Sequence, residues 1–441
     1  MVHFKRLGSK SDAEAAIHSY KQVITIASAS CLNTAGYYDE VSDVYRGLFE
    51  RFGGEETLKN LAYNSEQALL LTPDGDFDMP QRLVNAGSAK AWLSIYLNDR
   101  EQLQQSFSYI DQAEQHISDI HQNNPLLYAT LLEGIGSAYN NMLFNCSGLS
   151  EHAEKAVNYL ERAVQLTAPS HSVMVRRLYN LGSAYISLFV RLGQLDHLHK
   201  AVTCTERAVF LSSGNSQEQA RCLSNLAEQY CMLYTRTHGL KHLDKSVSCA
   251  EQAIQLIPES SPEKSDVLRS LGNSYIRLSE CLGEAQHTSK GLRYLEQALL
   301  LLPEKHLQKH GFLEDLNEAY QLSYLQTKRL EHLNQAIGCL NQALVLTSDT
   351  DRQRPWLLED LGDSHRLLFC RLDTLETAKK AIGYYKQAIS LIPENDPPKP
   401  APLDSLGRIY ICKNENSPWA LMSAQDLPER VSHPPLILGA H

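Results

Sequence analysis

The sequence predicts an all-α fold, an α-solenoid in which antiparallel helix pairs stack one after another. A unit best seen at residues 178–213 recurs along the 441-residue chain at intervals of 45 residues, with one interval of 50. Each unit carries two runs of apolar residues at spacings of three and four, the pattern of one helical face. A turn at Gly193 separates the two runs. Because one helix pair cannot bury its own apolar stripe, the repetition indicates stacked pairs that share a continuous core.

The repeat has two anchor positions that small residues occupy. The first is Ala208 in the second helix, and the second is Gly182 in the first helix, 26 residues earlier. The equivalents of Ala208 are Val23, Ala68, Ala113, Ala163, Ala253, Ala298, Ala343 and Ala388. The equivalents of Gly182 are Gly87, Gly136, Gly272, Gly362 and Gly407, with Ser42, Ala227 and Asn317 as substitutes. A larger side chain would hold the packed helices apart, so packing alone explains both positions.

The elements are expected in order from an incomplete first repeat. Residues 1–8 align with the end of a first helix, and residues 15–27 supply its second helix. Residues 38–71 and 83–117 follow as complete pairs, the latter with Lys90 where tyrosine is expected. The repeat signal is therefore weakest at this third unit.

The remaining repeats lead to an incomplete end. An insertion at residues 119–126 explains the interval of 50, and residues 131–391 then carry six regular pairs. Residues 403–412 match the first helix of a tenth pair whose second helix does not follow, so we expect about nine helix pairs within residues 1–412. Residues 413–441 hold four prolines and no matching period, which predicts a disordered tail or, alternatively, a divergent cap. Because the chain starts and stops inside a repeat, we expect it to be a segment of a longer protein.

The unit resembles the tetratricopeptide repeat (TPR). The matching residues are Leu181, Gly182, Tyr185, Ala201 and Ala208, with the terminal proline present as Pro73, Pro258, Pro303 and Pro393. The unit departs from that family in length, because the usual repeat has ~34 residues. Such lengthened repeats resemble the arrays that accompany CHAT peptidase domains or nucleotide-binding switch domains. The resemblance covers residues 1–412 and implies a TPR-like superhelix.

The composition of the chain limits the kinds of partner it can bind and the compartment in which it is expected. The net charge of −10 argues against broad binding to nucleic acid or an anionic membrane. The N-terminus has no apolar signal core and no apolar run is long enough for a membrane span, so we expect a soluble cytoplasmic protein. The ten cysteines include no CxxC, which disfavours a zinc site. Cys204, Cys249 and Cys339 recur at one repeat position and are expected to pack in a reduced compartment.

The sequence carries no recognisable catalytic or cofactor motif. It lacks GxxxxGK[ST], HExxH and GxSxG. His238 and His242, four residues apart, are the nearest approach to a metal-ligand pair, but no third ligand accompanies them, and a solvated turn is favoured. We therefore expect a protein that is not an enzyme and has no cofactor.

Two functions of different classes follow from these observations. The preferred hypothesis is a non-catalytic interaction scaffold that binds a peptide or partner protein along the groove of the array. The alternative is the sensor or regulatory arm of a larger effector with a CHAT peptidase or NTPase domain. Whether the coding region continues into such a domain would distinguish them.

The candidate binding residues are three arginine–asparagine pairs on successive first helices. They are Arg176 and Asn180, Arg221 and Asn225, and Arg269 and Asn273. A spacing of four puts both members of a pair on one helical face, and guanidinium and amide donors suit an acidic peptide or an extended backbone. The chemistry is similar to the carboxylate clamp of TPR co-chaperones, although Tyr179 and Ser224 stand where that clamp would have its first lysine. The alternative is an ordinary solvated polar face.

A second candidate surface is acidic. Its residues are Glu314, Asp315 and Glu318, then Glu359, Asp360 and Asp363, followed by Asp404. We expect these like charges to stack on successive first helices with no cation paired to them. In TPR arrays the first helices line the concave surface, so the resemblance implies an acidic strip that could hold a basic segment. A solvated acidic face that confers solubility is the alternative.

Overall fold

All regular structure in the described residues is α-helical, as predicted. The computed structural model describes residues 10–29, 34–97, 99–117, 124–142, 150–259, 261, 263–302, 306, 309–347 and 353–391. No strand occurs in these ranges, and none of their helices is long and apolar enough to cross a membrane. The expected start at residues 1–8, the tenth pair and the C-terminal tail lie outside the described residues.

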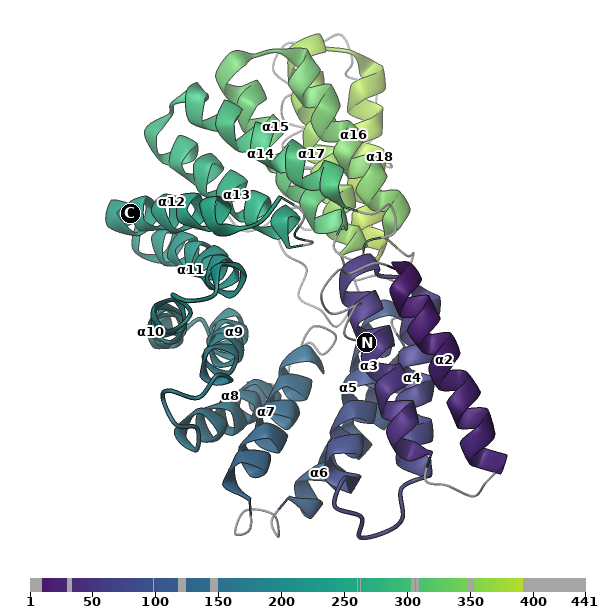
Figure 1. Ribbon diagram of the computed structural model, residues 1–441. Coiled ribbons are helices and arrows are strands. Elements are labelled where there is room, and N and C mark those ends of the chain that lie inside the picture. Colours follow the sequence, from purple (N-terminus) through teal and green to yellow (C-terminus); the bar gives the residue numbers. More distant parts are fainter. Residues whose placement is uncertain are drawn as a thin grey trace. The chain divides into compact units, whose positions relative to one another are not determined.

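The chain divides into two compact units. Figure 1 labels their helices. Unit 1 comprises Met1–Leu278 and Leu300–Leu307, and unit 2 comprises Ser279–Leu299 and Gln308–His441. Unit 1 contains α2 (Lys10–Ala29), α3 (Ala35–Phe52), α4 (Glu55–Leu70), α5 (Met79–Leu97), α6 (Arg100–His116), α7 (Pro125–Met142), α8 (Ser150–Gln165), α9 (Met174–Leu192), α10 (Leu195–Leu211), α11 (Ser216–Thr237), α12 (Leu240–Leu256) and most of α13 (Lys264–Leu282). Unit 2 contains most of α14 (Ala285–Leu301), then α15 (Lys309–Thr327), α16 (Leu330–Leu346), α17 (Arg354–Leu372) and α18 (Leu375–Leu391).

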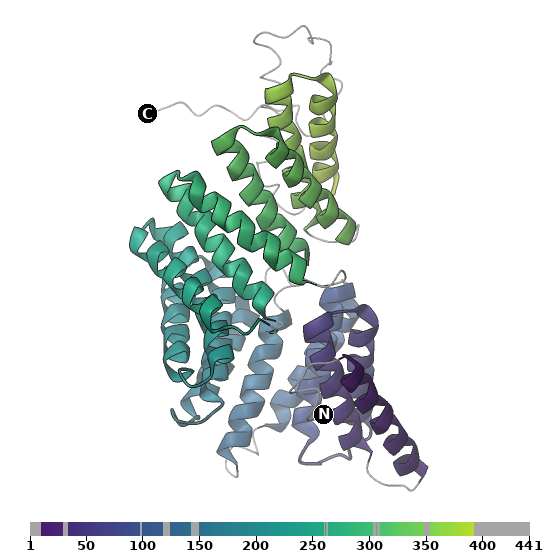
Figure 2. The ribbon, with the colours of Figure 1, turned by 45° about the horizontal axis from the view of Figure 1, so that its top comes forward.

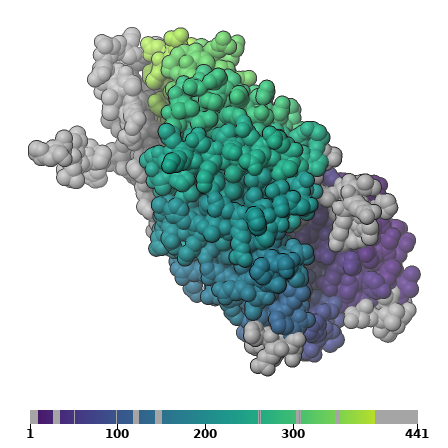
Figure 3. Space-filling model, turned by 60° about the vertical axis from the view of Figure 1, so that its left-hand side comes forward, coloured from purple at the N-terminus to yellow at the C-terminus, as the bar shows by residue number. Residues whose placement is uncertain are grey.

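Successive helices pack as antiparallel pairs inside each unit (Figure 2). In unit 1, α9 packs on α10 within a pair, and α10 then packs on α11 of the next pair. In unit 2, α15 and α16 pair in the same way, as do α17 and α18. In the space-filling view, the colours of α7 to α12 adjoin in chain order (Figure 3). Each unit therefore has the stacked-pair arrangement of a TPR-like α-solenoid.

Close helix contact explains the glycine anchors. A Cβ added at Gly182 would lie 2.8 Å from Thr205 Oγ1, and one added at Gly87 would lie 2.7 Å from Ile110 Cδ1. In each case the obstructing atom belongs to the second helix of the same pair. The alanine anchors from Ala68 to Ala388 are fully buried. These residues confirm that the small anchors allow close helix packing.

Val23 is the exception among the anchors. The structure places it on an exposed face of α2, whereas the next residue, Ile24, is buried. At the start of α2, Ala13 and Ile17 are buried in the expected register. Residues 1–8, which the sequence assigns to the first helix of this pair, lie outside the described residues. The assignment of Val23 as a buried anchor was therefore wrong.

One residue between the two helices of a pair adopts a left-handed conformation in repeat after repeat. Gly193 has φ of 68°, and its N–H donates to Phe189 O at 2.7 Å to close α9. The equivalent residues with positive φ are Gly53, His238, Gly283, Lys328 and Asp373. His238, the first member of the histidine pair, thus ends α11 as a left-handed cap.

A hydrogen bond between consecutive repeats explains the tyrosine of the motif. The Tyr320 hydroxyl donates to Glu296 Oε1 at 2.6 Å, and Tyr275 donates to Glu251 at 2.5 Å. Tyr185 and Tyr230 make the equivalent bonds to Glu161 and Glu206. In the third repeat, Lys90 Nζ lies 3.0 Å from Glu66 Oε1, and Glu66 occupies the same position as those glutamates. The lysine that weakened the repeat signal therefore keeps the partner that tyrosine has elsewhere.

Candidate functional site

A buried arginine joins α7, α8 and α9 in unit 1. Arg177 is fully buried, and its guanidinium donates to Glu133 Oε2 at 3.0 Å and to Thr130 Oγ1 at 2.9 Å. It also donates to Thr167 Oγ1. Thr167 in turn donates to Ala163 O at 2.6 Å, so its hydroxyl is positioned to accept from the arginine. A buried charge needs hydrogen-bond partners, and Arg177 has three of them: Glu133, Thr130 and Thr167.

The same junction occurs 95 residues earlier, between α3, α4 and α5. Arg82 Nε donates to Asp39 Oδ2 at 2.8 Å, and its Nη1 donates to Thr72 Oγ1 at 2.9 Å. Thr72 donates to Ala68 O at 2.6 Å, as Thr167 does to Ala163. Each residue occupies the same repeat position as its counterpart in the Glu133 junction. Arg82 Nη2 also lies 3.4 Å from Asp78 Oδ2. A single arginine, held by carboxylates and one threonine, is therefore sufficient to build this junction.

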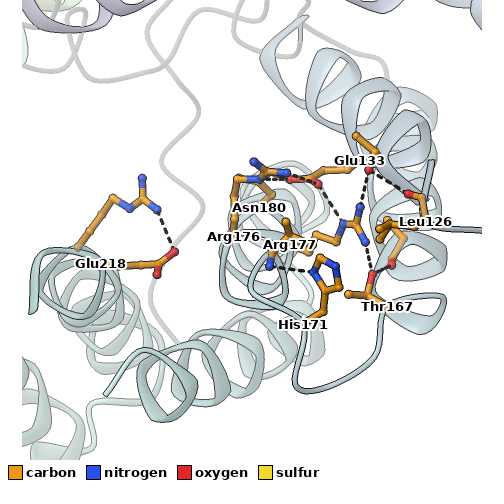
Figure 4. Close-up of polar contacts among 12 residues, drawn as sticks. Leu126, Glu133, Thr167, His171, Arg176, Arg177, Asn180 and Glu218 are labelled. Carbon is orange, nitrogen blue, oxygen red and sulfur yellow. Dashed lines mark hydrogen bonds and ion pairs between the residues drawn. The ribbon is translucent and has the colours of Figure 1, made fainter. Parts of the chain in front are cut away.

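The junction at Glu133 contains one arginine more than its counterpart. Arg176 Nε donates to Glu133 Oε1 at 2.7 Å and its Nη2 donates to Oε2 at 3.0 Å, while Asn180 Nδ2 donates to Oε1 at 3.1 Å (Figure 4). Gln81 occupies the position of Arg176 in the earlier junction and donates to Asn85 instead. The Arg176 side chain is 51% exposed, whereas that of Glu133 is 7% exposed. Arg176 is thus a surplus, accessible cation beside a carboxylate that Arg177 already neutralises.

Hydrogen bonding to Glu133 raises the pKa of the Arg176 guanidinium, and burial only partly opposes this effect. Arg176 therefore keeps its charge at any physiological pH. Arg177 carries the second charge on the same carboxylate. Arg176, Arg177 and Arg221 lie around two carboxylates, Glu133 and Glu218, which leaves a local excess of positive charge in a chain whose net charge is −10. Such a position favours an anionic group.

The second predicted pair contacts Tyr179 of the preceding first helix. The Arg221 guanidinium lies over the Tyr179 ring, 4.9 Å from its centroid, and 4.0 Å from Glu218 Oε1. Burial raises the pKa of Tyr179, and a hydrogen bond with Asn225 opposes this shift. Asn225 Oδ1 also accepts from Gln229 Nε2 at 2.5 Å. Glu133 and Tyr179 occupy the same repeat position, so the first two predicted pairs contact equivalent residues of the preceding repeat.

The third predicted pair, Arg269 and Asn273, lies on α13 and is half-buried. It is offset from the first two pairs by three positions in the repeat, as the sequence indicates. Both residues interact with neighbouring groups. The structure therefore gives a shared geometry to the first two pairs but not to the third.

Two hollows lie on the face that the first helices of unit 1 form. Hollow 1 has a volume of about 330 Å³ and is lined mainly by α3, α5 and α7, with Arg176 of α9. Hollow 2 has a volume of about 530 Å³ and is lined by α9 and α11, with Asn140 of α7. Both volumes fall within the range of ligand sites, ~300–1,000 Å³. Of the predicted residues, Arg176 lines hollow 1 and Asn225 lines hollow 2.

The acidic strip of unit 2 is partly paired. Arg366 Nε lies 3.1 Å from Asp363 Oδ1, which also accepts from the Tyr385 hydroxyl at 2.7 Å. The expectation that these carboxylates have no cation beside them was therefore wrong for Asp363. Arg366 is three residues further along α17, on the same helical face. Burial, followed by repulsion from the neighbouring carboxylates with Asp363 first, raises the pKa of Asp360 to about 7.

The described residues give little support to a metal site or to a reactive cysteine. They contain no group of three or more His, Cys, Asp or Glu side chains placed to hold a metal ion. His242 stacks on Tyr230, with ring centroids 6.2 Å apart. Burial raises the pKa of Cys204, Cys249 and Cys339 to about 11, so these thiols stay protonated near neutral pH. Their half-buried positions agree with the packing role that the sequence predicts.

Sequence reasoning missed Glu133, Arg177 and Thr167. The signal was present, because a threonine stands ten residues before an arginine in both junctions, at Thr72 and Arg82 and at Thr167 and Arg177. Arg177 lies next to Arg176 and belongs to a buried face, where arginine is uncommon. The sequence pointed to Arg176 instead, because the spacing of four between an arginine and an asparagine recurs at Arg221 and Asn225.

Comparisons with known proteins identify similar folds at low sequence identity. No family model matches the chain, and no curated protein matches it. TPR-like repeats of a kinesin light chain from Podosopora anserina cover 51% of this chain and 100% of their own, with 16% identity and a TM-score of 0.36. Aspartyl phosphate phosphatase F from Bacillus subtilis covers 87% and 94%, with 13% identity and a TM-score of 0.45. The apo form of the quorum sensor NprR from B. thuringiensis covers 91% and 98%, with 13% identity and a TM-score of 0.43.

Proposed function

We propose that the chain is a non-catalytic interaction scaffold that binds an extended segment of a partner protein along the first-helix face of unit 1. An acidic group of that segment meets Arg176. The observation that carries the proposal is the surplus of Arg176 over what the buried junction needs. Gln81 fills the same position in the equivalent junction, where Arg82 alone meets Asp39 and Thr72.

Arg176 can change partners at little cost to the fold. If its guanidinium turns towards a ligand, Glu133 still accepts from Arg177 at 3.0 Å and from Asn180 at 3.1 Å. Both carboxylate oxygens then keep a donor, so no uncompensated charge is left in the core. The bound carboxylate would replace Glu133 in a two-point contact with the guanidinium.

The lining of hollow 1 suits a peptide. Gln81, Asn85 and Asn141 supply side-chain amides, which can pair with the N–H and C=O groups of an extended backbone. Phe49 and Trp92 supply an apolar wall, with their rings 5.3 Å apart in an edge-to-face arrangement. A few polar groups in a partly aromatic hollow are typical of sites that fix a ligand's orientation.

The other predicted residues belong to the same proposal. Asn180 holds Glu133 in place when Arg176 leaves, while Arg221 and Asn225 continue the row of donors on α11. Arg221 Nε is buried and has no hydrogen-bond partner in the described part of the chain. Arg269 and Asn273 extend the row onto α13 at a different register. The partner is a protein segment, including an acidic one, and the net charge of −10 disfavours nucleic acid or an anionic membrane.

The wider setting of this function is also proposed. A cytoplasmic location agrees with the reduced cysteines in the described residues. Attachment to a CHAT peptidase or NTPase domain stays a prediction from the length of the repeat. In either setting, this chain would supply recognition and not chemistry.

Selection of random peptides on the full chain tests the proposal. Peptides displayed on phage are selected against the wild type, synthesised, and measured by fluorescence anisotropy. We expect acidic peptides whose affinity falls about tenfold for Arg176→Gln, since a charge-assisted pair contributes ~1.5–3 kcal/mol. The matched control is Arg371→Gln, which removes an exposed arginine of unit 2. Equal affinity for the wild type and both variants would reject the first-helix face as the binding site.

A further inference from the structure

We infer that hollow 2 is an apolar subsite that receives an aliphatic side chain of the same peptide whose acidic group meets Arg176. This inference rests on the proposed function and adds a second specificity element to it. Hollow 2 is the larger of the two hollows, at about 530 Å³. It adjoins hollow 1 through shared helices, because α7 and α9 contribute residues to both.

The wall of hollow 2 is apolar where a ligand can reach it. Ile186, Val190 and Met232 line it, and Val190 is 67% exposed. An exposed valine gains free energy when a ligand covers it, at ~25 cal/mol per Å² of apolar surface. Hollow 1, by contrast, is lined by two arginines, Arg46 and Arg176, and one carboxylate, Glu133. The two hollows therefore favour different parts of one ligand.

The charged residues that line hollow 2 do not favour a charged ligand. Arg191 and Glu228 both line it, so their charges cancel. Its remaining polar groups are the hydroxyls of Ser183 and Ser187 and three amides. A neutral hollow with an aliphatic wall fits an uncharged apolar side chain better than a second acidic one.

Two amides of hollow 2 favour a ligand that carries N–H groups. Gln229 is 1% exposed, and its Nε2 donates to Thr205 Oγ1 at 2.9 Å and to Asn225 Oδ1 at 2.5 Å. Those two bonds fix the orientation of its amide. Gln229 Oε1 and Asn140 Oδ1 are buried and accept from no donor in the described residues. Asn140 can turn its amide at small cost because its terminal torsion is soft, and its oxygen can then accept from a peptide N–H.

The geometry of α9 sets the spacing between the two ligand groups. Ser183 and Val190 lie 7 and 14 residues beyond Arg176 on the same helix, which corresponds to about 10 and 21 Å at ~1.5 Å per residue. An extended peptide advances ~3.3–3.6 Å per residue. The acidic and aliphatic residues of the ligand should therefore be roughly three to six positions apart.

The selected phage peptides described above also test this inference, with one more pair of variants. Val190→Gln removes the exposed aliphatic group of hollow 2, while Val345→Gln removes an exposed valine from the last turn of α16 in unit 2. Both variants should melt like the wild type, because both valines face solvent. We expect about fivefold weaker peptide binding for Val190→Gln and no change for Val345→Gln.

Peptide chemistry supplies an independent readout. Replacing the aliphatic residue of a selected peptide with serine should weaken binding to the wild type about fivefold but have little effect on Val190→Gln. Peptides that respond to Arg176→Gln but not to Val190→Gln would overturn hollow 2 as a subsite and leave the proposed function standing. Peptides that respond to neither variant, or a selection that yields no peptide, would overturn both.

Discussion

Glu133 shows how much of this protein's recognition chemistry depends on single residues. Its side chain is nearly buried, yet it accepts from two adjacent arginines and one asparagine. The buried arginine holds α7, α8 and α9 together, whereas the exposed one faces hollow 1. The two neighbours therefore have separate roles although they share one carboxylate.

The division of roles predicts a non-additive effect on stability. Arg176→Gln alone should change the free energy of unfolding by less than ~1 kcal/mol, because Arg177 still neutralises Glu133. Arg177→Met should cost about 1–3 kcal/mol through lost hydrogen bonds to Thr167 and Thr130. The double variant should cost more than the sum, since Glu133 then lacks any cation. Urea denaturation followed by circular dichroism would measure this, and additive costs would contradict the assignment of Arg176 as surplus.

The raised pKa of Asp360 predicts that the stability of unit 2 depends on pH. Burial, followed by repulsion from Asp363, Glu359, Glu314 and Glu318, raises its pKa to about 7. A carboxyl with a raised folded-state pKa contributes stability below the unfolded value of ~3.9 and loses it as pH rises towards about 7. Asp360→Asn should therefore raise the melting temperature at pH 8 and change it little at pH 4. An equal shift at both values would show that charge at Asp360 is not the cause.

At the scale of residues, the sequence predicted part of the site. A spacing of four placed Arg176 and Asn180 on one face, and both indeed contact Glu133. It could not show which residue of the preceding helix they would contact, because that depends on the offset between neighbouring repeats. For the same reason Asp363 was expected to lack a cation that Arg366 supplies.

At the scale of elements, the 45-residue period predicted the helix pairs well, because the anchors Gly87 and Gly182 have a direct steric cause. The residues that depart from the repeat pattern were harder to interpret from the sequence. Lys90 replaces the motif tyrosine, but its partner Glu66 lies in the preceding helix pair. Val23 aligned with the anchors although the described residues provide no first helix to cover it. A sequence alignment of repeats records position, whereas burial also depends on which neighbours are present.

Two glycines on the same helix pair allow steric and conformational costs to be separated. Gly193→Ala should cost about 1 kcal/mol, because it meets no atom within 4 Å but must adopt φ of 68°. Gly182→Ala should cost more, about 1–3 kcal/mol, because its Cβ would lie 2.8 Å from Thr205 Oγ1. Pairing Gly182→Ala with Thr205→Ala should recover stability, and Gly193→Ala should gain nothing from that second change. Thermal melting of the four variants would test this, and rescue of both glycine variants would refute the steric explanation.

At the scale of the whole molecule, the helix-pair pattern runs through both units, but their surfaces differ. The first-helix face of unit 1 combines surplus positive charge with two hollows, while that of unit 2 gathers carboxylates around Asp360. The sequence predicted the fold class because one period repeats along the chain. It did not predict the hollows, since a hollow arises where side chains of three or four helices leave space, which no single repeat reveals.

Photo-crosslinking of a selected acidic peptide to the full chain tests the central proposal most directly. A photoreactive residue next to the acidic group would be activated, and the modified protein residues identified by mass spectrometry. We expect crosslinks on α5, α7 and α9 around hollow 1, and their loss in Arg176→Gln but not in Arg371→Gln. Crosslinks confined to second helices or to unit 2, or crosslinks unaffected by Arg176→Gln, would contradict peptide recognition on the first-helix face.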